Sequence, residues 1–188
     1  MNKTNYKAAI SGAHSQGKTT LINELKHRNI VSEYKISFLS GVAREVGTYL
    51  PINEGGTLLT QYMILSKQAE ACLKPGRVIT DRSVLDVISY TRYHFNKGDI
   101  TVQEMDVLET IYKSCLPYYS RIFYIIPELP LVNDNVRSVG QEFFDKTVTQ
   151  FSHYIKLLQE TTDKVVLVKG SVAERIDIIE KQIKQDLE

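Results

Sequence analysis

The stretch that decides the fold is Gly12-Ala13-His14-Ser15-Gln16-Gly17-Lys18-Thr19, which has the form G-x-x-x-x-G-K-[ST]. It follows an apolar segment, Tyr6–Ser11 (YKAAIS), and it opens a pattern that predicts a helix from Lys18 to about His27. A strand, a glycine-containing loop and a helix in this order form the context in which the motif binds phosphate. We therefore expect a phosphate-binding loop between the first strand and the first helix.

The chemistry of this loop follows from its residue types. Glycines allow successive backbone N–H groups to point inward at phosphate oxygens, and the helix N-terminus adds a positive dipole. Lys18 is expected to reach the β- and γ-phosphates, and Thr19 to offer its hydroxyl to Mg²⁺. ATP and Mg²⁺ are the predicted cofactors. The predicted ATP-binding residues are Gly12, His14, Ser15, Gln16, Gly17, Lys18, Thr19 and Thr20, with the backbone of His14 and Ser15 doing more than their side chains.

The composition is that of an ordinary globular chain. It has 188 residues, of which 43% are hydrophobic and 24% charged, so we expect a single domain over residues 1–188 and no disordered or fibrous architecture. No apolar run approaches the roughly 18 residues of a membrane span, and no secretory signal is recognisable. Cys72 and Cys115 lack metal-ligand spacing and are expected to be buried thiols. A cytoplasmic location without membrane contact follows.

The net charge of +1 hides an asymmetry. Residues 1–94 carry twelve Lys/Arg against seven Asp/Glu, and residues 95–188 carry eleven against fifteen. The chain as a whole therefore lacks a polybasic footprint, but a basic face on its N-terminal half would suit nucleic acid.

The alternation of short apolar runs with amphipathic stretches predicts an α/β fold: a three-layer α/β/α sandwich around a mostly parallel five-stranded sheet. The expected strands are Tyr6–Ser11, Ile36–Leu39, Arg77–Thr80, Arg121–Ile126 and Lys164–Val168. The expected helices are Lys18–His27, Val42–Leu50, Leu58–Leu73, Val84–Phe95, one from Thr101 to before Pro117, Gly140–Thr161 and Ser171–Leu187.

A second acidic group is needed beside a triphosphate, and Asp81 directly follows a predicted strand. It could hold Mg²⁺, accept a proton, or cap the next helix. Arg82 could clamp a phosphate or the acceptor. Asp86 and Tyr90 share a helix face; for Asp86 a structural role and a substrate contact both stay open, and Tyr90 suits the core better than a stacking platform.

Two residues on the neighbouring elements are candidates for acceptor binding. Arg44 opens the helix after the second strand and would face the acceptor or pair on the surface. Gln61 lies near the start of the Leu58–Leu73 helix, where its amide could read a base edge or be an ordinary helix residue.

A lid is expected around residues 128–145. The polar loop 128–139 follows the strand RIFYII and carries one arginine, Arg137, just before the long helix. Phosphoryl transfer requires a cation over the γ-phosphate and exclusion of water, so Arg137 is a candidate catalytic residue beside Lys18 and Asp81. A surface arginine is the alternative.

The segment Asn96-Lys97-Gly98-Asp99 matches the N-K-x-D guanine-reading motif of GTPases. The residues before it continue a helical pattern, and Gly98 is typical of a helix C-cap. No D-x-x-G follows the Arg77–Thr80 strand, so a GTPase switch is disfavoured.

Together these features resemble the P-loop kinase-like NTPases around nicotinamide riboside kinase and related AAA-type NTPase/kinase domains. The likeness covers about residues 6–170 and rests on Gly12–Thr19, Ala43-Arg44-Glu45, Asp81-Arg82-Ser83 with Asp86, RIFYII before Pro127, and Arg137. It implies phosphorylation of a nucleoside- or nucleotide-type acceptor with ATP and Mg²⁺.

The resemblance also implies residue roles. Lys18 and Thr19 would hold the triphosphate and the metal, and Asp81 would hold the metal or act as the base. Arg82 and Arg44 would face the acceptor, and Arg137 would be the lid arginine.

The chain departs from such kinases at one position. They often carry an acidic residue two positions before the Ala-Arg pair, and Gly41 stands there. The acceptor and the general base are therefore open. The chain also resembles compact phage kinases of 5-hydroxymethyluracil in DNA, so a DNA-modifying kinase is the alternative, and an acceptor-independent NTPase is a third reading. Monomer and homodimer are both compatible with the sequence.

Overall fold

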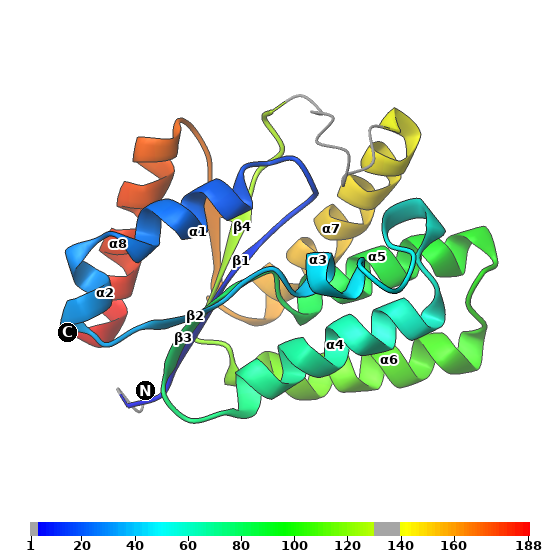
Figure 1. The fold of residues 1–188 in the computed structure, drawn as a ribbon, viewed down its shortest axis with the longest axis horizontal. Coiled ribbons are helices and arrows are strands. Elements are labelled where there is room, and N and C mark those ends of the chain that lie inside the picture. Colours follow the sequence, from blue (N-terminus) through cyan, green and yellow to red (C-terminus); the bar gives the residue numbers. More distant parts are fainter. Residues whose placement is uncertain (1–3, 130–139) are drawn as a thin grey trace.

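The computed structural model describes residues 4–129 and 140–188, and a five-stranded sheet forms its centre (Figure 1). The strands are β1 (Tyr6–Ser11), β2 (Ser37–Leu39), β3 (Arg77–Asp81), β4 (Arg121–Ile125) and β5 (Val165–Val168). Their order across the sheet is β2-β3-β1-β4-β5, and all four pairings are parallel. Because all strands run in one direction, the carboxyl ends of β1 and β3 meet at one edge, with Ile10 opposite Asp81.

The longer helices lie close to their predicted places. They are α1 (Lys18–Lys26), α4 (Leu58–Leu73), α5 (Val84–Lys97), α6 (Val102–Cys115), α7 (Gln141–Thr161) and α8 (Val172–Leu187). Four of them begin at a hydroxyl residue whose side chain accepts a backbone N–H of the first turn: Thr57, Ser83, Thr101 and Ser171. Such caps satisfy the orphan donors of the first turn and fix where each helix starts.

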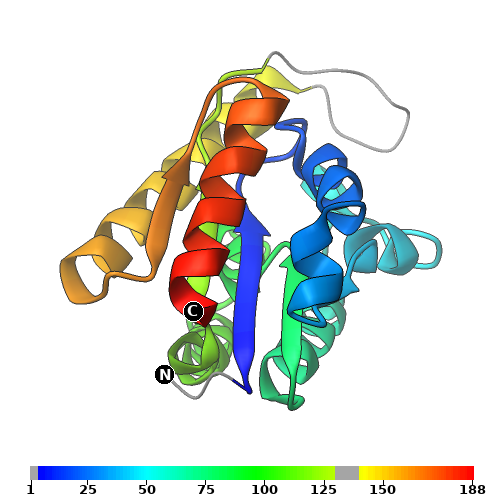
Figure 2. The same cartoon turned by 90° about the vertical axis from the view of Figure 1, so that its left-hand side faces the viewer.

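Two cores cover the two faces of the sheet. Tyr6, Ala8 and Ile10 of β1 pack with α1 and α8, whereas Ala9 packs with the core formed by α4, α5, α6 and α7. This alternation is the period of two expected of a strand buried on both faces. Figure 2 shows α1 and α8 on the viewer's side of the sheet, with α4, α5 and α6 behind it. The predicted three-layer α/β/α sandwich is confirmed.

The shorter elements differ from the sequence predictions. The helix predicted over Val42–Leu50 is a five-residue helix, α3 (Val42–Val46), and a short helix α2 (Asn29–Glu33) was not predicted. A single 3₁₀ turn, η1 (Asn53–Gly55), precedes α4, and another, η2 (Leu116–Tyr118), precedes β4. Helices of one turn bury one or two residues and therefore leave no periodic pattern in the sequence.

The GTPase-like segment forms the end of a helix. Asn96 and Lys97 lie in the last turn of α5, and Gly98 caps it with φ +89° while its N–H bonds back to the carbonyls of His94 and Phe95. A left-handed cap of this kind is the usual place for glycine. The prediction that this motif is not a guanine site agrees with its position.

Two further expectations concern the remaining chain. Cys72 and Cys115 are buried and free, as predicted. Within residues 4–129 and 140–188 no helix is long and apolar enough to span a membrane.

Candidate active site

The phosphate loop leaves β1 at Ser11 and enters α1 at Lys18. Gly12 has φ +143°, and a Cβ built on it would lie 2.9 Å from the carbonyl oxygen of Ile125, so only glycine allows the loop to pass this close to β4. Gly17 is the N-cap of α1, in the left-handed region at φ +81°. The two glycines of the motif thus fix the entry to and the exit from the loop.

Lys18 folds back across the loop. Its Nζ donates to the carbonyl oxygens of Gly12 at 2.7 Å and Ala13 at 2.6 Å, and the side chain is buried. This places the ammonium group over the concave side of the loop, where the motif requires a cation beside phosphate oxygens.

Thr19 and Asp81 bring the loop and the tip of β3 together. The Thr19 hydroxyl donates to Asp81 Oδ2 at 3.2 Å, and the Asp81 carboxylate is largely buried. A hydroxyl and a carboxylate are oxygen ligands suited to Mg²⁺, which usually keeps waters and substrate phosphates as its other ligands. The described chain holds no cluster of three or more His, Cys, Asp or Glu that could bind a metal by itself. The residues therefore fit a phosphate-bound Mg²⁺ better than a resident metal.

The cap of α5 is Ser83, and Asp86 completes it. Asp86 Oδ2 accepts the Ser83 N–H at 2.9 Å and the Ser83 hydroxyl at 3.2 Å, while Oδ1 accepts the N–H of Gly12 at 3.2 Å. The possibility that Asp81 caps this helix is therefore wrong, because the N-cap is Ser83, two residues after Asp81. Burial raises the pKa of Asp86, against the charges of Lys18 and Arg82. Asp86 thus ties the phosphate loop to the start of α5.

Arg82 stands at the turn between Asp81 and this cap. Its φ is +78°, a region that non-glycine residues rarely adopt and that is common at functional sites. The guanidinium lies 5.5 Å from the centre of the Tyr90 ring and 3.9 Å from Asp86 Oδ1. Burial opposes its charge, but Tyr90, Asp86 and Asp81 outweigh that effect and raise the pKa of Arg82. Arg82 therefore stays protonated.

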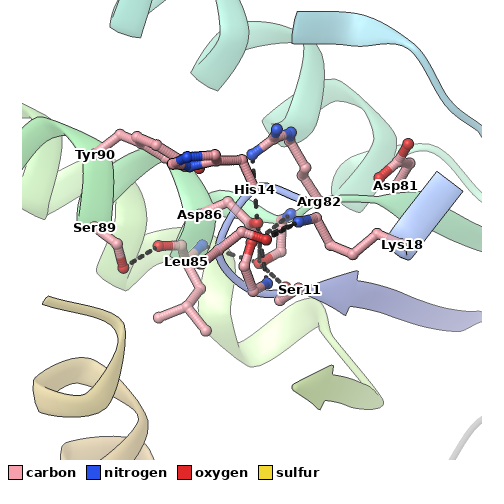
Figure 3. Close-up of polar contacts among 12 residues, drawn as sticks. Ser11, His14, Lys18, Asp81, Arg82, Leu85, Asp86, Ser89 and Tyr90 are labelled. Atoms are coloured by element: carbon pink, nitrogen blue, oxygen red, sulfur yellow. Dashed lines mark hydrogen bonds and ion pairs between the residues drawn. The ribbon is translucent and has the colours of Figure 1, made fainter. Parts of the chain in front are cut away.

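The side chain of His14 packs into an aromatic cluster, and Figure 3 shows it beside Tyr90. Its ring lies 5.3 Å from that of Phe143 and 5.4 Å from that of Phe144, and Nδ1 is 3.3 Å from the Tyr90 hydroxyl. Tyr90 itself is buried, as expected of a core aromatic, and burial raises the pKa of its hydroxyl. His14 thus anchors the phosphate loop to α5 and α7.

Gln16 anchors the other side of the loop. Its Oε1 accepts the N–H groups of Glu128 and Leu129, both at 2.9 Å, and its Nε2 donates to the Leu129 carbonyl at 2.8 Å. Arg175 of α8 is buried and donates to the Gln16 carbonyl at 2.9 Å and to Glu128 Oε2 at 3.0 Å. The segment after β4 is therefore fixed to the phosphate loop. Sequence reasoning missed Arg175, because only the tertiary packing of α8 reveals it.

One cavity brings most of the predicted site residues together. Its lining includes the predicted residues His14, Ser15, Gln16, Gly17, Lys18, Thr19, Arg44, Gln61, Asp81, Arg82 and Asp86. Gly12 and Thr20 are not among the residues that line it. The predicted lid falls partly, and Arg137 wholly, outside the described residues. The cavity also contains residues that the sequence analysis missed: Ile52, Asn53, Ile64 and Val87.

The far wall of the cavity comes from α3, η1 and α4. Gln61 is 5% exposed, and its amide makes no hydrogen bond within the described ranges, so it is available to a ligand. Arg44 is exposed at the rim, and no ion pair joins its guanidinium to another part of the described chain. Asn53 has φ +58°, and its carbonyl lies 3.0 Å from His94 Nε2. The only feature of the sequence that could have indicated Asn53 as a cavity residue is its position as a polar residue in a Pro/Gly-rich turn.

Comparison with known proteins supports the fold. A family model described as an AAA domain matches residues 7–175. Among solved structures, the NadR protein in complex with NR aligns with 95% of this chain and 51% of its own, at a TM-score of 0.70 and 17% identity. Deoxyadenosine kinase from M. mycoides with bound dCTP aligns with 95% of this chain and 99% of its own, at a TM-score of 0.71 and 14% identity.

The chain spans about half the length of NadR, and its likeness to both proteins lies in the fold. A search of curated proteins found no match.

Proposed function

The chain belongs to the AAA domain family, and we propose that it is an ATP-dependent kinase that transfers the γ-phosphoryl group of ATP to a nucleoside- or nucleotide-type acceptor. The observation that carries this proposal is the 3.2 Å contact between Thr19 of the phosphate loop and Asp81 at the tip of β3. This contact supports a role for the two residues in binding Mg²⁺, and the lining of the same cavity includes Arg44 and Gln61.

The donor side of the proposal rests on the loop. The backbone N–H groups of residues 12–19 and the N-terminus of α1 would hold the triphosphate, and Lys18 would leave its two carbonyl partners to bind the β- and γ-phosphates. Thr19 and Asp81 would hold Mg²⁺, which neutralises phosphate charge when bound. Positioning and charge neutralisation provide most of the rate in this reaction class.

The acceptor side rests on Arg82, which follows β3, and on the wall formed by α3 and α4. Arg82 and Arg44 present guanidinium groups, and the buried amide of Gln61 can exchange two hydrogen bonds with a base edge. The names of the structural neighbours, a deoxyadenosine kinase and a protein solved in complex with NR, agree with a nucleoside-type ligand. Arg137 remains our proposed lid arginine, and it lies outside the described residues.

Transfer of label from γ-³²P-ATP tests this proposal. The wild-type protein should label one acceptor in a panel of nucleosides, nucleoside monophosphates and hydroxymethylated DNA, and Lys18→Ala should abolish transfer while it leaves the circular dichroism spectrum unchanged. Lys26→Ala, at the opposite end of α1, is the matched control and should keep full activity. Full activity in Lys18→Ala would show that the loop does not bind the donor.

The panel separates the alternatives as well. Exclusive labelling of DNA, with binding that weakens steeply as salt rises, would identify the DNA-modifying kinase to which the basic N-terminal half points. ATP hydrolysis that is independent of every acceptor would identify an NTPase.

A further inference from the structure

Some of the charged side chains that line the cavity already have a role at the phosphate loop, and others do not. Three cations line it, Lys18, Arg44 and Arg82, together with two carboxylates, Asp81 and Asp86. Lys18 belongs to the phosphate loop, and Asp81 is engaged by Thr19 at 3.2 Å. The remaining three groups, Arg44, Arg82 and Asp86, are the candidates for contact with the acceptor.

Asp86 is poorly placed to take a proton from an acceptor. Its side chain is 1% exposed, and it already accepts three hydrogen bonds, from the N–H of Gly12 and from the N–H and hydroxyl of Ser83. A general base must come within hydrogen-bonding distance of the proton that it removes. Asp86 could do so only by giving up the bonds that fix the phosphate loop and the start of α5.

The tip of β2 offers no other carboxylate. Gly41 occupies that place, in the left-handed region at φ +81°. The nearest acidic residue in the chain, Glu45, is turned outward and accepts a hydrogen bond from Lys67 Nζ at 2.7 Å. In the proposed kinase Asp81 would hold Mg²⁺, so within residues 4–129 and 140–188 the cavity lining offers no further carboxylate that is free to activate a hydroxyl group.

The two arginines, in contrast, can bind an anion. Arg44 has no ion-pair partner among the residues that the structure describes, and the only ion pair of Arg82 there is the 3.9 Å contact with Asp86. A guanidinium group matches the geometry of a phosphate group and binds it through paired N–H donors. Two such groups beside a cavity without a free base suit an acceptor that arrives with its own negative charge.

We propose that the acceptor is a nucleoside monophosphate whose phosphate group receives the phosphoryl group, and not a neutral nucleoside. This inference rests on the proposed kinase function. A non-bridging oxygen of the acceptor phosphate forms the new bond to the γ-phosphorus of ATP, the bond from that phosphorus to the β–γ bridging oxygen breaks, and the electron pair leaves on ADP. The products are ADP and a nucleoside diphosphate. A dianionic acceptor phosphate carries no proton on the attacking oxygen, so no base is needed.

The first experiment compares matched pairs of acceptors. Each nucleoside and its 5′-monophosphate are offered to the wild-type protein with γ-³²P-ATP and Mg²⁺. We expect labelled diphosphate from at least one monophosphate and at least a hundredfold lower transfer to its nucleoside. Transfer to nucleosides or to hydroxymethylated DNA with all monophosphates inert would overturn the inference and leave the kinase function intact. No transfer to any acceptor would overturn both.

The pH profile gives an independent measurement. The second pKa of a phosphate monoester is about 6, so kcat/KM for the monophosphate should rise through that pH and then stay level. A profile that follows a protein carboxylate for every acceptor would contradict the proposal.

The second experiment changes the charge at the tip of β2. A Cβ at Gly41 meets no atom within 4 Å, and Asp and Asn are the side chains best tolerated at positive φ, so Gly41→Asp and Gly41→Asn form a pair that differs in charge alone. We expect kcat/KM for the monophosphate to be about tenfold lower in Gly41→Asp than in Gly41→Asn, a difference of about 1.4 kcal/mol. Equal values, or higher activity in Gly41→Asp, would contradict the proposal.

Removal of a proposed phosphate ligand is the third experiment. Arg44→Ala should raise KM for the monophosphate at least tenfold and leave KM for ATP unchanged. Arg28→Ala is the control, since Arg28 is an exposed arginine with a 3.8 Å contact to Glu180 and is not among the residues that line the cavity. Equal KM values for the monophosphate in the two variants would exclude Arg44 from acceptor binding.

Discussion

Replacement of Asp86 by asparagine should weaken the whole fold, because one carboxylate holds two elements together. The amide introduced by Asp86→Asn can keep its oxygen toward the N–H and hydroxyl of Ser83, but its NH₂ group then faces the N–H of Gly12, where Asp86 now accepts a 3.2 Å hydrogen bond. One bond to a charged acceptor disappears, at about 1.5–3 kcal/mol, and a buried donor is left without a partner, at about 1–3 kcal/mol.

Removal of the charge offsets part of this loss. Burial raises the pKa of Asp86, which shows that the ionised carboxylate is itself costly to bury. We therefore expect Asp86→Asn to lower the free energy of unfolding by about 3 kcal/mol, a large share of the roughly 5–15 kcal/mol that holds a domain together.

Urea denaturation followed by circular dichroism measures this change. With an m value of about 2 kcal/mol/M, the midpoint should fall by about 1.5 M while m stays constant. Asp106→Asn is the control: Asp106 is an exposed carboxylate of α6, and its replacement should shift the free energy of unfolding by no more than about 0.5 kcal/mol. If the two variants have the same midpoint, Asp86 does not join the phosphate loop to α5.

Two further predictions concern the loop and its support. Gly12→Ala should lower Tm and abolish ATP binding, since the added Cβ would lie 2.9 Å from the Ile125 carbonyl at a φ of +143°; an unchanged Tm would refute the close approach. The hydrogen bond from the N–H of Gly170, and to a lesser degree Arg175, lowers the pKa of Glu128 below its usual 4.5. The ionised Glu128 carboxylate therefore stabilises the fold fully above pH 4.5, and this stabilisation is lost as pH falls through the lowered pKa. The difference in Tm between wild type and Glu128→Gln should therefore shrink below pH 4.5, and a difference independent of pH would contradict this reading.

Local sequence signals were sufficient to predict where the phosphate-loop motif lies in the fold. The motif Gly12–Thr19 lies between β1 and α1 as predicted, because its glycines and its flanking apolar strand act over short distances in the chain. The parallel sheet then follows from alternating strands and helices, and it places Asp81 beside Thr19 across 62 positions of sequence. The sequence could predict this meeting because the carboxyl ends of parallel strands share one edge.

Residues whose roles depend on tertiary packing were harder to predict. The ring of His14 lies between residues of α5 and α7, and no pattern in the neighbouring sequence predicts that contact. Asn53 reaches the cavity from a single 3₁₀ turn, and the one-turn helix α2 lacks the repeats from which a helix is recognised. The spacing of Asp86 alone is compatible with a structural or a functional role, and only the structure shows the three hydrogen bonds that it accepts from Gly12 and Ser83.

The most direct test of the account is a crystal structure of the protein with a non-hydrolysable ATP analogue and Mg²⁺. We predict the β- and γ-phosphates inside the loop of residues 12–19, with Lys18 Nζ moved from the carbonyls of Gly12 and Ala13 onto phosphate oxygens. The same structure should show Mg²⁺ beside the Thr19 hydroxyl and the Asp81 carboxylate. An analogue bound elsewhere, with Lys18 still on both carbonyls, would contradict the account.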